Sequence, residues 1–195
     1  MLTEWSAECG ADDPVIEVPW TSPDGALRWT DLRTDPHAVD EITEADEYPA
    51  LLAALRALNA SRSPVYTSKC DVWEMDADEL AHLRADLLLE EDVATAGITS
   101  YIDIVVADRT TFASRHQAEQ LMHRIDRMAG ELPHSLAKLE LVLRPAVVDF
   151  DAVQEGYAIT LYVKGCGVDI FEANERWSAA LRDVARLIRG MQPRS

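Results

Sequence analysis

The sequence contains few cysteines, and their spacing excludes the usual cysteine-based sites. Among 195 residues there are three, Cys9, Cys70 and Cys166, and no two of them form a CxxC pair. Structural zinc sites and thioredoxin-type redox sites are built from such pairs. An odd number of cysteines also leaves at least one thiol without a disulfide partner. We therefore expect reduced thiols and no cysteine-bound metal.

Long apolar runs are missing as well. No stretch approaches the ~20 apolar residues that a membrane-spanning helix needs. The opening residues, MLTEWSAECGADDP, lack the basic start and the apolar core of a secretory signal. We therefore expect a cytoplasmic protein.

Basic residues are scarce. The chain has 18 Lys and Arg against 35 Asp and Glu, a formal net charge of -17, and residues 1–50 alone hold 13 acids against two arginines. Such a surface repels phosphate backbones and anionic lipids. The composition therefore predicts that the protein binds neither nucleic acid nor membranes. The acidic residues 35–47 are instead a candidate surface for a protein partner.

Phosphate-binding glycine loops are also missing from the sequence. Gly165 and Gly167 form an isolated GxG without the fuller GxGxxG or GxxxxGK[ST] spacing, so no cofactor is identified. Cys166 lies between them, ahead of a predicted helix, and is a weak candidate nucleophile because a helix N-terminus lowers a thiol pKa. Asp169 is the expected N-cap of the same helix. The alternative interpretation is an ordinary tight turn between strand and helix.

Apolar residues make up 48% of the chain, which is enough for a core of ordinary size. We expect an acidic N-terminal arm and helical extension in residues 1–62, packed on an α+β core domain in residues 63–195. In that domain, alternating apolar residues predict four strands, and 3.6-residue periodicity predicts three helices. The predicted strands are 65–75, 98–106, 139–148 and 157–164, and the predicted helices are 77–90, capped by Asp76 with Glu79 at N3, 111–129 and 171–189.

This order of elements predicts the fold class. With residues 65–75 as an edge strand, the four strands form an antiparallel sheet with helices on one face. That is a ferredoxin-like arrangement entered at a different strand. The alternative is a more open α+β sheet that includes a short strand at residues 26–32.

Alternation also sorts the strand side chains between the two faces of the sheet. One face is apolar and suits the helices; we call the opposite one the mixed face. In the first strand we expect Tyr66, Ser68, Cys70 and Val72 to point toward the helices. The mixed face is then expected to carry nine polar or aromatic side chains: Lys69, Asp71, Trp73, Tyr101, Asp103, Glu140, Arg144, Tyr162 and Lys164.

Aromatic walls with a few convergent charges are typical of a binding cleft. We therefore predict that the mixed face binds a small molecule or a protein partner. The residues expected to bind it are Lys69, Trp73, Tyr101, Arg144, Tyr162 and Lys164. The alternative is a small enzyme in which Asp71 and Asp103 share acid-base chemistry. A face of this kind is also a candidate to be covered by the N-terminal arm or by a second subunit of a homodimer.

His116, Glu119 and His123 have the spacing of metal ligands on one helix. Their stripe falls opposite the apolar stripe of the same helix, so it faces water. An exposed ridge lacks the supporting contacts that orient metal ligands. We therefore predict no metal site there.

Overall fold

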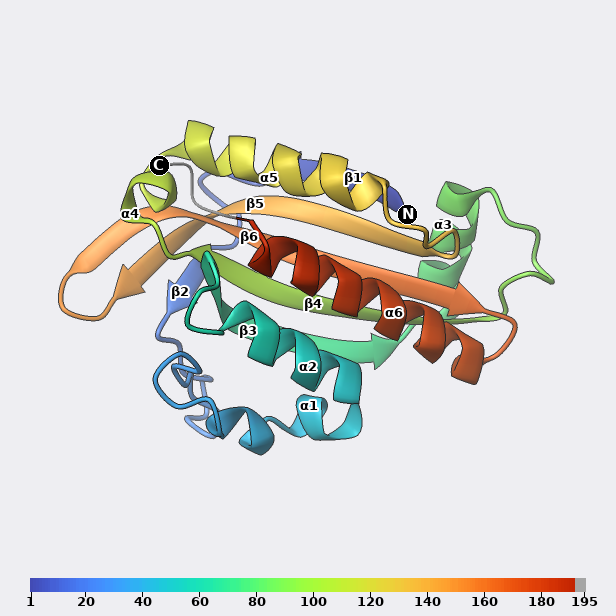
Figure 1. Ribbon diagram of the computed structural model, residues 1–195, viewed down its shortest axis with the longest axis horizontal. Helices are drawn as coiled ribbons and strands as arrows, with labels where there is room; N and C mark the ends of the chain where they lie inside the picture. The colour runs from blue at the N-terminus through green and yellow to red at the C-terminus, as the bar shows by residue number, and fades with distance from the viewer. Residues whose placement is uncertain (192–195) are drawn as a thin grey trace.

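The chain forms one six-stranded sheet with helices on both faces in the computed structural model, which describes residues 1–191 (Figure 1). The strands are β1 (Leu2–Ala7), β2 (Ile16–Val18), β3 (Val65–Glu74), β4 (Ala96–Val106), β5 (Ala137–Asp149) and β6 (Val153–Gly167). The helices are the 3-10 turn η1 (Ala38–Glu41), α1 (Thr43–Glu47), α2 (Pro49–Leu58), α3 (Ala77–Leu87), α4 (Arg109–Phe112), α5 (Arg115–Gly130) and α6 (Ile170–Arg189). The α+β class predicted from the sequence is confirmed.

Local sequence explains where the main helices begin. Asp76 and Glu79 form a capping box at the start of α3, with the Asp76 side chain accepting the amide of Glu79. Asp169 accepts the amide of Glu172 and begins α6, as the sequence predicts. Pro49 occupies the first turn of α2, where a missing N–H costs nothing.

The sheet order is β1-β5-β6-β4-β3, and β2 also pairs with β5. The four predicted strands β3 to β6 pair antiparallel, but the sheet is larger than predicted, because β1 and β2 both add parallel to the outer edge of β5. The predicted strand at 26–32 is wrong: that segment forms only an isolated bridge between Thr21 and Arg28. The ferredoxin-like description stays a prediction.

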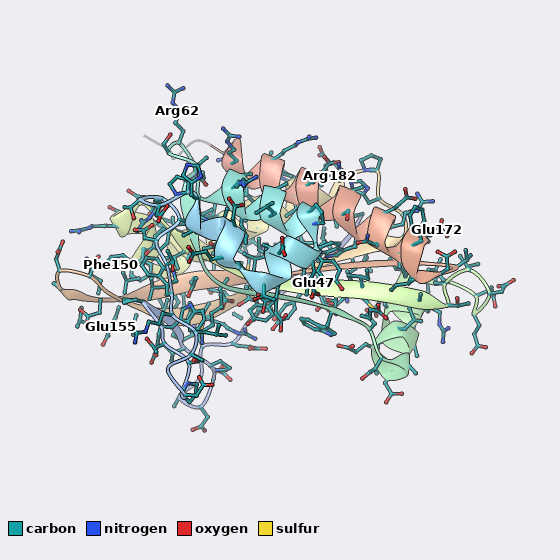
Figure 2. The ribbon with its side chains drawn as sticks, turned by 90° about the horizontal axis from the view of Figure 1, so that it is seen from below. Glu47, Arg62, Phe150, Glu155, Glu172 and Arg182 are labelled. Atoms are coloured by element: carbon teal, nitrogen blue, oxygen red, sulfur yellow. The ribbon has the colours of Figure 1, made fainter. Side chains whose placement is uncertain are left out.

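The helices do not all lie on one face, which corrects a second part of the fold prediction. Helices α2, α5 and α6 cover one face, where the main core contains the fully buried Trp177 (Figure 1). Helix α3 lies on the mixed face at one end, where Leu80 and Leu83 pack on Cys166. Figure 2 shows α3 on the side of the sheet opposite α2 and α6.

A β-bulge in β3 changes which side chains reach the mixed face. The ladder with β4 pairs Thr67 with Ile104 and then Cys70 with Ile102, so β3 holds one extra residue there. Beyond the bulge, Cys70 packs against the main core as predicted. Before the bulge the prediction is wrong: Tyr66 packs with Val105 on the mixed face.

The segment between β1 and η1 covers the other end of the mixed face. We call it the 8–35 segment. Its residues Ile16 and Val18 form a second small core with Tyr66 and Val105. The mixed face is thus covered at one end by α3 and at the other by the 8–35 segment, and Figure 2 shows both on the same side of the sheet.

Within residues 1–191, no helix combines the length and the apolar composition needed to cross a membrane.

Candidate functional site

One straight row of side chains crosses the middle of the mixed face. The strand registers place Asp71 beside Tyr101, Tyr101 beside Tyr162, Tyr162 beside Glu140, and Glu140 beside Glu4. We call these five residues the central row. Neighbouring strands lie about 4.8 Å apart, so the row is continuous across five strands. Tyr101 and Tyr162 therefore lie side by side, with Asp71 at one end of the pair and Glu140 and Glu4 at the other.

Trp73 extends this aromatic surface along β3. Its ring lies 6.4 Å from that of Tyr101, and the Tyr101 ring lies 6.1 Å from that of Tyr162. The Trp73 indole N–H donates to the carboxylate of Glu79 at 3.2 Å, which fixes the ring against α3. All three rings are only partly buried. They form the open floor between α3 and the 8–35 segment, and we use that term for Trp73, Tyr101 and Tyr162.

A small pocket of about 180 Å³ adjoins the open floor at the end covered by the 8–35 segment. Residues 14–17 form its outer wall. The sheet contributes five side chains: Lys69, Tyr101, Asp103, Arg144 and Tyr162. All five were expected on the mixed face from the sequence, and the structure brings them to one place.

A chain of polar contacts runs beside the pocket. Arg144 donates to the Glu8 carboxylate at 2.8 and 3.0 Å and to the Thr160 hydroxyl at 3.1 Å. Thr160 in turn donates to Asp103 Oδ1 at 2.6 Å. Asp103 is 6% exposed, and its burial raises the pKa of the carboxyl, against the opposing effects of the Thr160 hydrogen bond and the nearby cations Arg144 and Lys69.

A second polar cluster surrounds the buried Lys138. Its ammonium lies 2.7 Å from Glu4, 2.7 Å from Asp86 and 2.8 Å from Glu140. Burial alone lowers the pKa of Lys138, but the hydrogen bonds to Asp86, Glu140 and Glu4 raise it above its ordinary value. Glu140 also binds Lys164 at 2.7 Å.

The three carboxylates around Lys138 have oxygens within 4.8 Å of one another, a spacing that suits a metal ion. Lys138 donates to all three of them. The ammonium therefore already supplies the positive charge that this group of oxygens requires. No pattern in the sequence pointed to this residue, because its partners come from β1, α3 and β5.

Two tryptophans attach the 8–35 segment to the bulge of β3. The indole N–H of Trp29 donates to the Thr67 carbonyl and that of Trp20 donates to the Ser68 carbonyl, each at 3.1 Å. The bulge leaves these carbonyls at the free edge of the sheet, where they need donors. Lys69 reaches back over the Trp20 ring at 5.0 Å from its centroid.

The two candidate acid-base residues hold different partners. Asp71 Oδ1 accepts the amide of Val72 at 2.7 Å, whereas Asp103 bonds to Thr160 on the neighbouring strand. In the ladder, Asp71 lies opposite Tyr101. Shared chemistry between the two aspartates stays a prediction. Sequence reasoning missed Glu8 and Thr160, although Thr160 alternates in phase with Tyr162.

The two cysteines in the sheet, Cys70 and Cys166, lie in positions that disfavour a reactive thiolate. Burial raises the pKa of Cys70 to about 12 and that of Cys166 to about 11. Cys166 is fully buried beneath α3, and its Sγ contacts the Leu136 carbonyl at 3.6 Å. Strand β6 continues through Gly167, so Cys166 lies inside the strand, and the tight turn to α6 consists of Val168 and Asp169.

On α5, the side chains of His116, Glu119 and His123, which have the spacing of metal ligands, each contact a different neighbouring residue. His116 bonds to Gln120 at 2.9 Å, and Glu119 pairs with Arg115 at 2.8 Å. The rings of His123 and Trp5 are nearly perpendicular, with their centroids 4.4 Å apart. The contact between His123 and Trp5 therefore helps to hold α5 against β1.

Comparison with known proteins identifies no relative: no protein family model, no curated protein and no solved structure matches this chain.

Proposed function

We propose that the protein is a binding module whose recognition surface is the open floor of the mixed face. The observation that carries this proposal is the partly exposed row Trp73, Tyr101 and Tyr162 between two covered ends of the sheet. Tryptophan and tyrosine are the side chains that most often dominate protein interfaces. One ring of this surface is also held in place, because the Trp73 indole N–H donates to the Glu79 carboxylate.

The size of the pocket favours a protein partner over a free small molecule. At about 180 Å³ it is smaller than the roughly 300–1,000 Å³ of a usual ligand site. It suits a single side chain or a few atoms of a larger partner. The three aromatic rings of the open floor beside it supply the remaining contact area.

The polar groups around the floor support binding more than catalysis. Lys138, Lys164 and Arg144 are each held by carboxylates, and Asp71 accepts a backbone amide. Groups that satisfy one another in this way maintain the shape of a surface. One observation favours the alternative of a small enzyme, namely the raised pKa of Asp103 beside the pocket, which suits a general acid.

The finer description of fold and location belongs to the same proposal. We propose that β3 to β6 with α5 and α6 form a permuted ferredoxin-like unit that acts in the cytoplasm. The strand order β3-β4-β6-β5, with α5 joining β4 to β5 and α6 following β6, supports the fold part of this proposal.

The proposal is tested by selecting short random peptides, displayed on phage, against the purified protein. We expect enriched peptides that bind the wild type but lose most of their affinity for Trp73→Ala and Tyr162→Ala. The matched control is Phe171→Ala, which removes a ring that is 70% exposed at the start of α6. Peptides that bind all three variants alike, or a selection without enrichment, would contradict the proposal. Turnover of a small-molecule library that is lost in Asp103→Asn would favour the enzyme instead.

A further inference from the structure

We infer that the partner is a basic segment of another protein, one arginine of which lies over Tyr101 and Tyr162 and pairs with Asp71. This inference rests on the proposed function and names the chemistry of the partner. It is carried by three features of the mixed face: the order of residues in the central row, the charges of its two walls, and the state of its own cations.

The central row has the composition of a site for a guanidinium group. Tyr101 and Tyr162 are adjacent in register, with Asp71 on one side and Glu140 on the other. A planar cation is attracted to the face of a tyrosine ring and at the same time to a carboxylate at the ring edge. Trp73, 6.4 Å from Tyr101, provides a second ring for the aliphatic part of the side chain.

Asp71 is the carboxylate of this row that remains available. Its Oδ1 accepts the Val72 amide, and within residues 1–191 no donor is found for its Oδ2. Glu140, by contrast, is bound by Lys138 and Lys164. A partner's arginine over the tyrosines therefore finds one free carboxylate oxygen, on the β3 side.

Both walls of the open floor are acidic. Residues 76–92, which contain α3, hold seven carboxylates against one arginine, and residues 8–17 hold four carboxylates and no basic residue. Both segments remain acidic when Asp86, paired with Lys138, and Glu8, paired with Arg144, are left out. Walls of one sign raise the local concentration of oppositely charged partners and repel those of the same sign. A basic segment is thus attracted along the whole length of the floor.

Carboxylates neutralise three of the four cations on the mixed face. Lys138 is surrounded by three carboxylates, Lys164 is paired with Glu140, and Arg144 is paired with Glu8. Lys69 lies at the pocket end, over the Trp20 ring. An arginine suits the remaining position better than a lysine, since its flat and weakly hydrated head group stacks on aromatic rings.

The test combines peptide selection with a double-mutant cycle. Peptides enriched on the wild-type protein are measured by fluorescence anisotropy, with each arginine of the peptide replaced in turn by glutamine. We expect one arginine whose replacement weakens binding about tenfold or more, and an equal loss for Asp71→Asn in the protein. Combining the two changes should cost little more than either alone, because they remove the same contact.

The variants are matched so that folding and net charge do not confuse the result. Asn at position 71 keeps an acceptor for the Val72 amide, and its fold is checked by thermal unfolding. Asp151→Asn, in the exposed turn between β5 and β6, removes the same charge away from the floor and should leave affinity unchanged. Binding should also weaken when salt is raised from about 50 to about 500 mM, because screening shortens the range of the acidic walls.

The outcomes separate this inference from the proposed function. Enriched peptides without arginine that still lose affinity for Trp73→Ala would overturn the inference and leave the binding module standing. Arginine peptides whose losses add independently of Asp71→Asn would overturn the pairing. Peptides indifferent to Trp73→Ala, or no enrichment, would overturn both.

Discussion

The ammonium of Lys138 in β5 lies 2.7 Å from Oδ2 of Asp86 in α3, and this contact joins the sheet to the helix on its mixed face. The lysine is 3% exposed, but the Asp86 and Glu4 side chains remain 42% and 65% exposed, so the cluster is only partly buried. Together with Glu4 and Glu140 it forms a cluster in which one cation holds three carboxylates. Removing the lysine leaves three neighbouring carboxylates without their shared cation, and water offsets only part of their mutual repulsion.

Lys138→Met should therefore lower the free energy of unfolding by about 1.5–3 kcal/mol, because water screens the exposed partners Glu4 and Asp86. The comparison is Lys164→Met, which removes a more exposed lysine with a single carboxylate partner and should cost about 1 kcal/mol or less. Urea denaturation measures both. Millimolar calcium should stabilise Lys138→Met more than the wild type, because the three vacated carboxylates then offer oxygen ligands within 4.8 Å. Equal costs for the two lysines would contradict this account of the cluster.

Asp103→Asn should stabilise the protein at neutral pH. Burial raises the pKa of Asp103 in the folded state, so its protonated form is the one that the fold prefers. Stability from this group is fully present below the unfolded pKa of about 3.9 and is lost as pH rises through the folded pKa. Asparagine keeps the acceptor for Thr160 and removes the charge.

The check is the difference in unfolding free energy between Asp103→Asn and wild type, measured from about pH 4 to pH 7. It should grow in favour of the variant as pH rises. Asp151→Asn serves as the exposed control and should show no such trend. A variant that loses stability relative to wild type as pH rises would mean that Arg144 and Lys69 outweigh the burial of Asp103.

Thr99→Val should raise the free energy of unfolding by about 1 kcal/mol. Thr99 is 1% exposed and its hydroxyl has no hydrogen-bond partner among residues 1–191, so valine removes an unsatisfied polar atom and keeps the shape. The neighbouring Ser100→Ala should act in the opposite direction, because Ser100 Oγ accepts the Trp177 indole at 2.9 Å. Thermal unfolding of the two variants gives the sign of each stability change. A loss of stability in Thr99→Val would indicate that the Thr99 hydroxyl makes a hydrogen bond.

Trp20→Phe combined with Trp29→Phe should release the 8–35 segment. Both changes keep an aromatic ring and remove the indole donors to Ser68 and Thr67. Each lost bond should cost about 1 kcal/mol, and limited proteolysis should cut the 8–35 segment faster than in wild type. Trp5→Phe is the control, since its ring packs on His123. Unchanged cleavage would mean that the cluster around Ile16 and Val18 holds the segment by itself.

Much of the fold follows from short-range patterns. The alternation in β4, β5 and β6 places Tyr101, Arg144 and Tyr162 on the mixed face, because a two-residue period needs only the strand itself. The caps at Asp76 and Asp169 are equally local. The bulge in β3 is different: one extra residue reverses the faces of Tyr66 and Thr67, and the pattern of that strand alone does not reveal it.

The sequence by itself determined the α+β class, the helix-facing sides of three strands, the inward placement of Cys70, and the set of polar and aromatic residues on the mixed face. Only the tertiary structure decided that β1 and β2 join β5, that Lys138 holds Glu4 and Asp86, and that the central row lines up across five strands. The physical reason is the distance along the chain over which each kind of interaction acts. Periodicity and capping act within a few residues, whereas strand register and buried ion pairs join residues as far apart as Glu4 and Lys138, whose meeting depends on the whole folded chain.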